Sequence, residues 1–587
     1  MTRRAVLLDA QRTIVPQDGT LHFVLNRWEP YDSHFVSLPE RVDQAAEPIQ
    51  AEIASWISTT KSAMAREIRV TGSDLDPLIA DMNPCFEGNY ATTPEFYLLA
   101  QLMALVFALE HADVSELSYL GDDSRVSACL GDWCNQRGIA FEFAPQLIKP
   151  ISGLRNYLSA AKRLLRVMAL GIRNTMRATA VPTDVSYVLI DYLVMNPIRT
   201  YWGPLLSILP THPKTLCVHN FAPHDAIPSI WGAFKHMRRV RSSEPSTIHL
   251  LPDELICIRD YFPIWKTYQN LVAAWRVFST EVQPRLPRPY GLQPALLLGN
   301  RLRMGWRGSA AVDTATQLVI FDRLSEVLGE TTKVFYLQEN HTWEKTMLYH
   351  FHKRSERIVG VSHTAVRPLD LRYQFIARDF ADYHRLERLL PNRIASNGEI
   401  SRRFLEARID QSFLVDVEAL RFMSLSDTSP RDMTTPHIAL IAGDLQPSHS
   451  EFVLRTAIFP LKKAGYKLIF KPHPADRGSL SIATEFGIEV SNEPISVLLG
   501  KCAIIVVGSI TAACVEAAQL GIPIVTVVDP NYFNLSPLRD SEVSSFAYSS
   551  QQVSDSVRSI REFGGTQQSN FLCLDRSLSR WKQLLVE

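Results

Sequence analysis

The last third of the chain alternates short apolar runs with turn residues. Residues 466–470 form one run, which stops at a Lys-Pro-His-Pro sequence, where two prolines cannot lie inside a helix or a paired strand. Residues 503–507 form a second run, followed by Gly508 and by small and apolar residues at helical spacing up to Gly521. Residues 524–528 form a third. This alternation predicts a parallel sheet, whose ligands bind beyond the carboxyl ends of the strands.

The earlier parts of the chain show weaker versions of the same pattern. Residues 5–8 predict a strand, residues 95–109 a helix that follows a proline, and residues 117–143 a strand, a helix and a second strand. Four later apolar runs end in polar or aromatic clusters: 185–191, 214–218, 333–337 and 357–361. These runs predict a second Rossmann-like region from about residue 186 to residue 394.

The expected domain division follows from the turn residues between these regions. Pro, Asn and Gly gather at residues 390–398, and beyond them we expect a helix over 401–422 and a strand over 437–442. We therefore predict an α/β protein with two Rossmann-like domains that face a central cleft. Their expected limits are 1–395, with helical insertions, and 396–570. A final helix within 571–587 is expected to pack back on the first domain.

Composition narrows the class of protein. At 587 residues the chain exceeds one hydrophobic core, and 46% hydrophobic with 21% charged residues is typical of a globular chain. Lys plus Arg and Asp plus Glu balance at 61 each, so no bulk charge favours nucleic acid as a partner. Eight cysteines without a CxxC pair indicate a reducing cytoplasm and no zinc site. No stretch resembles a signal peptide or a membrane span, which predicts a cytoplasmic protein, soluble or peripheral.

One predicted helix, residues 153–178, carries only basic charge. Its sequence GLRNYLSAAKRLLRVMALGIRNTMRA contains no acidic residue, and its basic residues are Arg155, Lys162, Arg163, Arg166, Arg173 and Arg177. A basic amphipathic helix of this kind can lie on an anionic membrane surface, here the inner membrane. It equally fits a solvated helix that links two parts of a domain.

Phosphate binding is favoured where residue 508 leads into a helix. Gly508 would allow close approach, Ser509 and Thr511 would supply hydroxyl groups, and a helix N-terminus offers free N–H groups and a positive dipole end. An isolated Ser or Thr at such a position is also the usual helix cap. Glu516, five residues beyond Thr511, could accept from ribose hydroxyls or could be a solvated helix residue.

The Lys-Pro-His-Pro turn presents a cationic group at a neighbouring strand end. Its residues are Lys471, Pro472, His473 and Pro474. A phosphate beside His473 would favour the protonated ring, which could then donate to that phosphate as a leaving group. Lys471 would add electrostatic stabilisation. With His473 and Lys471 in these roles no metal is required, and we expect none.

Two further strand ends carry ionisable side chains. Glu339 and Glu344 follow the run at 333–337, and His363 follows the run at 357–361, with Asp370 close behind. A lone histidine after a strand is more often structural, but two such clusters on neighbouring strands favour a site. These four residues are the candidates for a catalytic base or nucleophile, Glu339 and His363 before the others.

Residues 471–474, 508–511 and 516–523 resemble the nucleotide-sugar domain of GT-B glycosyltransferases. The resemblance is to bacterial enzymes that use CMP-activated sugars, namely sialyltransferases, polysialyltransferases and capsule Kdo transferases. It implies that His473, Ser509 and Thr511 contact the CMP phosphate. The sequences YLQENHTWEK, SHTAVRPLDLRY and PNRIASNG, between residues 336 and 398, also look like those of long surface-carbohydrate biosynthesis proteins.

The resemblance implies a GT-B-like glycosyltransferase that moves a nonulosonic acid, such as Kdo or a sialic-acid relative, from a CMP donor to a bacterial surface polysaccharide or glycolipid. The donor would lie on the C-terminal domain, with Gly443 and Asp444 near its base or ribose, and the acceptor on the N-terminal domain. No cofactor beyond the nucleotide sugar is expected. Two alternatives stay open: a transferase or epimerase with a UDP-, GDP- or CDP-linked donor, and a non-catalytic polysaccharide-assembly protein with a degenerate nucleotide site.

Overall fold

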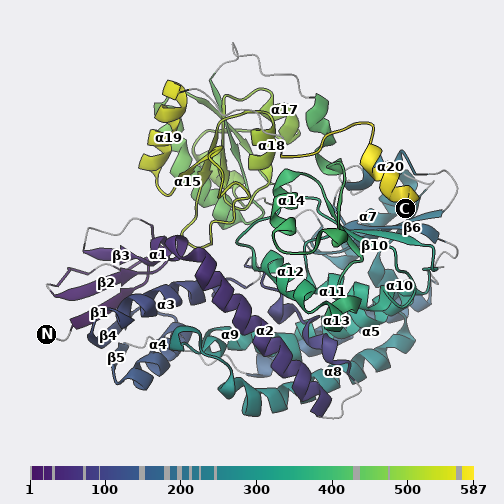
Figure 1. The fold of residues 1–587 in the computed structure, drawn as a ribbon, viewed down its shortest axis with the longest axis horizontal. Coiled ribbons are helices and arrows are strands. Elements are labelled where there is room, and N and C mark those ends of the chain that lie inside the picture. Colours follow the sequence, from purple (N-terminus) through teal and green to yellow (C-terminus); the bar gives the residue numbers. More distant parts are fainter. Residues whose placement is uncertain are drawn as a thin grey trace.

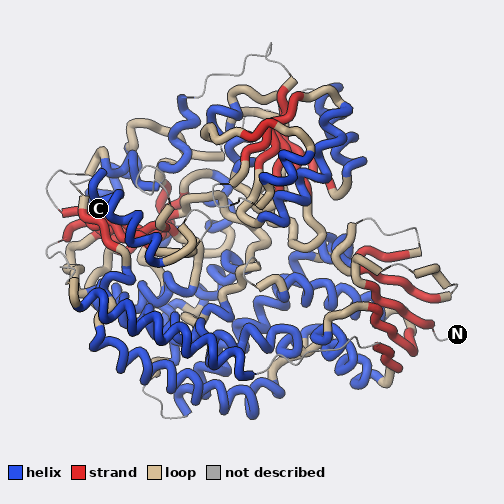
Figure 2. Tube along the Cα trace, turned by 180° about the vertical axis from the view of Figure 1, so that it is seen from behind, coloured by secondary structure: helices blue, strands red, loops and turns tan. Residues whose placement is uncertain are grey.

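The computed structural model describes residues 3–12, 14–17, 19–28, 34–70, 75–90, 93–143, 153–177, 185–194, 201–209, 214–223, 227–243, 247–427, 437–473, 476, 478–563 and 571–587. Within them the strands form three separate sheets, and every recorded strand pair is parallel. Figures 1 and 2 show the three sheets well apart, with helices packed around and between them.

The first sheet has the strand order β3-β2-β1-β4-β5. Its strands are β1 (Arg3–Leu8), β2 (Thr20–Val24), β3 (Phe35–Ser37), β4 (Val114–Leu120) and β5 (Ala140–Phe143). Its helices are α1 (Leu38–Gln44), α2 (Ala46–Val70), α3 (Glu95–Glu110) and α4 (Ser124–Arg137). Pro94 precedes α3 as the sequence predicts, and α4 ends at Gly138, whose left-handed backbone (φ +67°) favours glycine.

The second sheet has seven strands in the order β12-β11-β10-β9-β6-β7-β8. They are β6 (Val185–Tyr192), β7 (Lys214–Asn220), β8 (Ile248–Leu250), β9 (Lys333–Leu337), β10 (Ile358–Val361), β11 (Arg393–Ser396) and β12 (Leu414–Asp416). The helices are α5 (Gly153–Thr175), α6 (Gly203–Leu206), α7 (Ile230–Ser243), α8 (Tyr261–Val277), α9 (Pro294–Arg307), α10 (Ser309–Ser325), α11 (Thr342–Phe351), α12 (Leu371–Ala381), α13 (Tyr383–Leu386) and α14 (Glu399–Glu406). Residues 1–395 therefore hold two sheets, and the second continues past residue 395.

The third sheet has six strands in the order β15-β14-β13-β16-β17-β18. They are β13 (Ile438–Ala442), β14 (Lys467–Lys471), β15 (Glu489–Val490), β16 (Ile504–Gly508), β17 (Ile524–Val527) and β18 (Ser544–Ala547). The helices are α15 (Pro447–Lys463), α16 (Leu480–Glu485), α17 (Ile495–Leu499), α18 (Ala513–Gln519), α19 (Ser550–Phe563) and α20 (Ser579–Val586).

The first two sheets share one hydrophobic core. Leu7 of β1, Leu105 of α3, Trp306 of α9 and Val334 of β9 are all fully buried members of a single cluster. Phe533, from the loop after β17, enters the same cluster and lies against Tyr90 and Tyr97, with ring centroids 4.8 and 5.0 Å apart.

The packing of Phe533 links the N-terminal region to the six-stranded sheet, and polar contacts strengthen this link. Asp43 of α1 accepts hydrogen bonds from Arg539 (2.9 Å) and from the Tyr548 hydroxyl (3.0 Å). Trp28 donates its indole N–H to the Val528 carbonyl at 2.8 Å. The N-terminal region therefore contacts the six-stranded sheet through both apolar and polar groups.

The last helix returns from the third sheet to the second. Trp581 of α20 is fully buried against Phe335 of β9, with ring centroids 5.6 Å apart. The backbone N–H groups of Arg580 and Trp581 donate to the buried Glu418 carboxylate at 3.0 and 3.1 Å, which caps the start of the helix. Two Rossmann-like sheets joined by a returning C-terminal helix are the GT-B arrangement, so the predicted fold is confirmed, with the first sheet as a third unit.

One predicted element is wrong. Residues 401–422 do not form a continuous helix, because α14 ends at Glu406 and β12 follows it. β12 pairs with β11 at the edge of the seven-stranded sheet, and this pairing overrides the local helical pattern. The 3-10 turns at Leu420–Asp427 then bring Arg421 to the carboxyl edge of that sheet.

Candidate functional site

Three of the predicted site residues, Glu339, Gly443 and Gly508, lie next to the points where the two sheets reverse their strand order. In the seven-stranded sheet β6 comes first in the chain and β7 and β9 pair on its two sides, so the reversal lies between β6 and β9, next to Glu339. In the six-stranded sheet it lies between β13 and β16, which end at Ala442, just before Gly443, and at Gly508. Ligands of open α/β sheets bind in the crevice at this point.

The carboxyl edges of the two sheets adjoin each other. Arg367, in the loop after β10, donates a hydrogen bond to the carbonyl of Ile510, in the loop after β16, at 3.5 Å. Beyond the effect of burial, Arg421 further lowers the pKa of His363 on one sheet and of His473 on the other. The two predicted clusters therefore lie on opposite sides of one junction.

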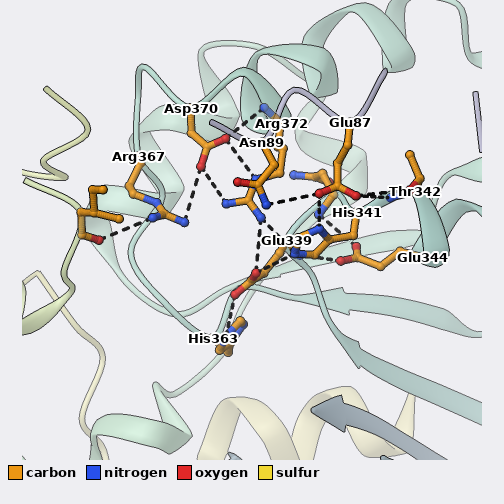
Figure 3. A network of polar contacts seen from close by, with 12 residues as sticks. Glu87, Asn89, Glu339, His341, Thr342, Glu344, His363, Arg367, Asp370 and Arg372 are labelled. Carbon is orange, nitrogen blue, oxygen red and sulfur yellow. Dashed lines mark hydrogen bonds and ion pairs between the residues drawn. The ribbon is translucent and has the colours of Figure 1, made fainter. Parts of the chain in front are cut away.

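Figure 3 shows Glu339 among three side chains that donate to it. His363 Nε2 lies 3.2 Å from its Oε1, and His341 Nε2 and Arg372 Nη1 lie 3.0 and 3.4 Å from its Oε2. Burial alone would raise the pKa of Glu339, but the hydrogen bonds from the two histidines hold it well below its ordinary value. An acid so strongly ionised accepts protons poorly, which favours an orienting role for Glu339 over that of a base.

His363 has the properties of a base in this arrangement. Because Nε2 faces the Glu339 carboxylate, we assign the proton to Nε2, which leaves Nδ1 as an acceptor. Nδ1 has no hydrogen-bond partner among the described residues. Burial lowers the pKa of His363, and Glu339 offsets only part of that effect, so the ring is neutral at pH 7. Its ring lies edge-on to Tyr201, with centroids 5.6 Å apart.

A small pocket lies beside this histidine. His363, Tyr201, Asn397 and Arg421 line it together with residues of β9, β10 and the segment after β12. The Asn397 amide nitrogen is buried and, like His363 Nδ1, has no hydrogen-bond partner among the described residues. The pocket thus offers one acceptor, one donor and one cation at the junction of the sheets.

The other two predicted acids have structural partners. Both oxygens of Glu344 accept backbone N–H groups, from Glu339 and Asn340 at 3.0 Å each, and burial raises its pKa to about 7. Asn340 has a left-handed backbone (φ 61°), which Asn tolerates better than most residues. Asp370 caps α12 and pairs with Arg372 at 2.8 Å. The geometry favours a role in positioning the loops for both acids.

The stability of this cluster should depend on pH through His341. Burial alone would lower its pKa from 6.5, but Glu87 at 2.8 Å and Glu339 raise it to about 10. A raised folded-state pKa contributes stability that is fully present below pH 6.5 and lost as the pH rises toward 10. His341→Gln should therefore lower the melting temperature most below pH 6.5, and thermal unfolding should show the difference from wild type shrinking toward pH 10. A difference that grows with pH would contradict the ion pairs.

On the six-stranded sheet, His473 lies close to the end of β13. A Cβ on Gly443 would come within 3.2 Å of the His473 backbone nitrogen, so the two loops approach closely. Asp444 is buried, and its carboxylate contacts His449 Nδ1 at 3.0 Å. Burial lowers the pKa of His473, Asp444 opposes this effect, and Arg421 and Lys471 add to it. The net effect of these groups leaves the pKa of His473 below its ordinary value. Pro474 lies outside the described residues.

The helix after β16 begins later than the sequence predicts. α18 starts at Ala513, residues 509–512 form a turn, and Thr511 Oγ1 accepts the Ala513 N–H at 3.3 Å. Thr511 thus accepts the first N–H group of the helix from a position one residue before the N-cap, Ala512. Ser509 is fully buried, and its hydroxyl has no partner among the described residues. Gly508 is required here, since a Cβ would lie 2.5 Å from His449 Cε1.

Two further ionisable side chains, Glu516 and Lys471, belong to the site at the six-stranded sheet. Glu516 is buried in α18, and burial raises its pKa to about 7, while Arg421 acts against the rise. Lys471, at the end of β14, is half-buried, and burial lowers its pKa. Among the described residues no group of three or more His, Cys, Asp or Glu side chains could hold a metal ion.

Sequence reasoning missed three residues of the site. Glu87, more than 250 positions before His341, binds both that ring and the Thr342 hydroxyl. Arg421 lies in a segment wrongly predicted as helix, and His449 lies on α15 beneath the Gly508 turn. No pattern within the sequence links these residues to the site, since only the packing of distant segments brings them there.

A second buried chain of polar groups lies in the seven-stranded sheet, on the neighbouring strands β6, β7 and β8. Asp191 Oδ1 lies 2.5 Å from His219 Nδ1, and His219 Nε2 lies 3.0 Å from His249 Nδ1. Burial raises the pKa of Asp191, and the nearby His219 and His363 act against this. His363 therefore lies close enough to Asp191 to affect the pKa of that carboxyl group.

No protein-family model and no curated protein sequence matches this chain. Several solved structures do. The UDP-GlcNAc 2-epimerase of Neisseria meningitidis, bound to UDP-GlcNAc, has 11% identity and a TM-score of 0.38 over 68% of this chain and 100% of that chain. A glycosyltransferase from Rickettsia africae ESF-5 has 10% identity and a TM-score of 0.35, and MurG of Acinetobacter baumannii 9% and 0.34, each over 69% of this chain and 94% of its own. Scores this low carry no conclusion about activity, so any functional assignment rests on the site.

Proposed function

We propose that the protein is a glycosyltransferase that moves a nonulosonic acid from a CMP-linked donor to a surface glycan or glycolipid. One observation carries the proposal: the Glu339–His363 pair lies beside the reversal point of one sheet, and the His473 loop lies against the Gly443 loop at the reversal point of the adjoining sheet. This arrangement holds a neutral base opposite an anion-binding edge. A single displacement, in which the acceptor hydroxyl attacks the anomeric carbon opposite the leaving phosphate, needs these two groups on opposite sides of the reacting bond.

In the proposed reaction, the donor phosphate binds beside His473 and Lys471. Its negative charge raises the pKa of His473, so that the ring becomes protonated and donates a hydrogen bond to a phosphate oxygen. The buried Ser509 hydroxyl supplies a further donor in the loop after β16. Glu516 accepts hydrogen bonds from the ribose. These contacts stabilise the charge that develops on the phosphate as it leaves.

The acceptor hydroxyl binds on the other side, at Nδ1 of His363. As the hydroxyl oxygen attacks the anomeric carbon, its proton passes to Nδ1, and the bond from that carbon to the phosphate oxygen breaks. The ring then carries a positive charge, which the ionised Glu339 at 3.2 Å stabilises. Glu339 thus holds the ring in the tautomer that accepts the proton.

Arg421 supports an acidic donor sugar. Its side chain is exposed and lies within electrostatic reach of His363, His473 and Glu516. The carboxylate of a nonulosonic acid bound between the two edges would pair with such a guanidinium, and a neutral hexose would not.

The nucleotide preference provides the direct test. A ligand that binds only the folded state stabilises it, by about 2.7 kcal/mol at roughly 100 times its Kd. We expect CMP to raise the melting temperature more than UDP, GDP or CDP at equal concentration, and CMP-linked nonulosonic acid to be consumed when a glycan acceptor is added. A larger shift with UDP, GDP or CDP would assign a different donor class. No shift with any of the four would favour a non-catalytic role.

A further inference from the structure

Helix α5 exposes a continuous apolar stripe to solvent. We define the α5 stripe as Leu154, Leu158, Leu165 and Ile172 of the helix and Met176 in the turn that directly follows it, whose side chains are between 47 and 77% exposed. Their spacings of four, seven, seven and four residues place them on one face of the helix. The opposite face packs into the main core through Ala160, Leu164, Val167 and Leu170. Figure 1 shows α5 at the edge of the molecule away from the six-stranded sheet.

Neighbouring elements extend the apolar surface. The Ile258 N–H donates to Thr175 Oγ1 at 3.1 Å, and the Ile258 side chain beside it is exposed. Trp231 of α7 is also exposed and lies under Arg173, whose guanidinium is 5.8 Å from the ring centroid. An exposed apolar surface that runs over three elements marks an interaction site on most soluble proteins.

Basic side chains border the stripe on one side. Arg155, Lys162 and Arg177 are exposed, and Arg238 of α7 lies close enough to Arg173 to lower its pKa, after the larger effect of burial. Two further basic residues make internal contacts, since Arg163 pairs with Asp313 and Arg173 lies 3.6 Å from the Phe234 ring centroid. The helix holds no acidic residue, so the border is positive throughout.

We propose that the α5 stripe docks on an anionic phospholipid bilayer. The apolar side chains would enter the boundary between head groups and acyl chains, and the basic border would contact the head groups. A second copy of this chain is a poorer partner, because a two-fold contact would place the same positive charges opposite each other. Among the described helices none is long and apolar enough to cross a membrane, so the docking is peripheral.

Vesicle co-sedimentation tests the proposal with the full chain. Wild type should sediment with phosphatidylcholine vesicles that contain about a third phosphatidylglycerol, and bind neutral vesicles at least about fivefold less. Leu158→Glu with Leu165→Glu should lower the bound fraction by about fivefold or more. Arg155→Gln with Lys162→Gln should lose the preference for anionic vesicles. Phe459→Glu, at a 65% exposed side chain of α15, is the matched control and should bind as wild type does.

Several outcomes would overturn the proposal. Wild type that stays in the supernatant with anionic vesicles, or stripe variants that bind as wild type does, would do so. A wild-type dimer that becomes monomeric in the Leu158→Glu, Leu165→Glu variant would assign the stripe to a second copy instead. Retained circular dichroism and melting temperature would show that the variants fold. Because vesicle binding needs no nucleotide, this result is independent of the proposed transferase activity.

Discussion

His363→Ala is expected to lower kcat by a factor on the order of 10² to 10⁴, the usual contribution of a positioned general base. CMP should still raise the melting temperature of this variant, because His363 lies on the opposite edge from the proposed nucleotide site. The measurement is steady-state transfer from the CMP-linked donor to a soluble acceptor, together with thermal unfolding in CMP.

The pH profile separates a base from a merely structural histidine. Since the pKa of His363 lies below its ordinary 6.5, wild-type kcat should decline in acidic solution, where this ring takes up a proton and no longer acts as a base. The residual activity of His363→Ala should lack that acidic decline. His352→Gln, at a histidine that binds the Leu390 carbonyl instead, is the matched control. Wild-type kcat in His363→Ala would exclude the base assignment.

His473→Ala should abolish detectable transfer and weaken CMP binding while the protein remains folded. Loss of a hydrogen bond to a charged group costs about 1.5–3 kcal/mol, which corresponds to roughly 10- to 100-fold in Kd. The expected result is a much smaller rise in melting temperature with CMP than in wild type. Calorimetric titration with CMP gives the same comparison directly.

The control for His473 lies on the same sheet at the opposite edge. His437 is exposed, just before β13, and contacts only the Tyr466 ring among its recorded ring contacts in the described residues. His437→Ala should bind CMP and transfer sugar as wild type does. If His473→Ala retained full activity, the proposed phosphate site would have to be abandoned.

The sequence predicted the strand ends of the six-stranded sheet more directly than the site at the seven-stranded sheet. The strands that carry the His473 and Gly508 loops were predicted to within a residue or so, because apolar runs between turn residues encode buried parallel strands locally. The helix start was placed too early, since the sequence could not show that residues 509–512 form a turn before α18.

At the carboxyl edge of the seven-stranded sheet, the roles of the ionisable side chains could be distinguished only from the tertiary structure. The sequence placed Glu339, Glu344, His363 and Asp370 at strand ends but could not rank them. Contacts with distant residues make the distinction: Glu87 helps to hold His341 charged and Arg372 pairs with Glu339, whereas nearby backbone N–H groups occupy Glu344. Such contacts depend on which segments pack together, and no local pattern records them.

By itself, therefore, the sequence determined the α/β class, most strands of the two facing sheets and the loops that end in polar residues. These features follow from hydrophobic period and turn chemistry over a few residues. Only the tertiary structure decided that His363 Nδ1 has no hydrogen-bond partner among the described residues, that Arg421 lies between the two edges and that the α5 stripe is exposed. Charge state and exposure depend on neighbours from every packed element, so they emerge only when the chain has folded.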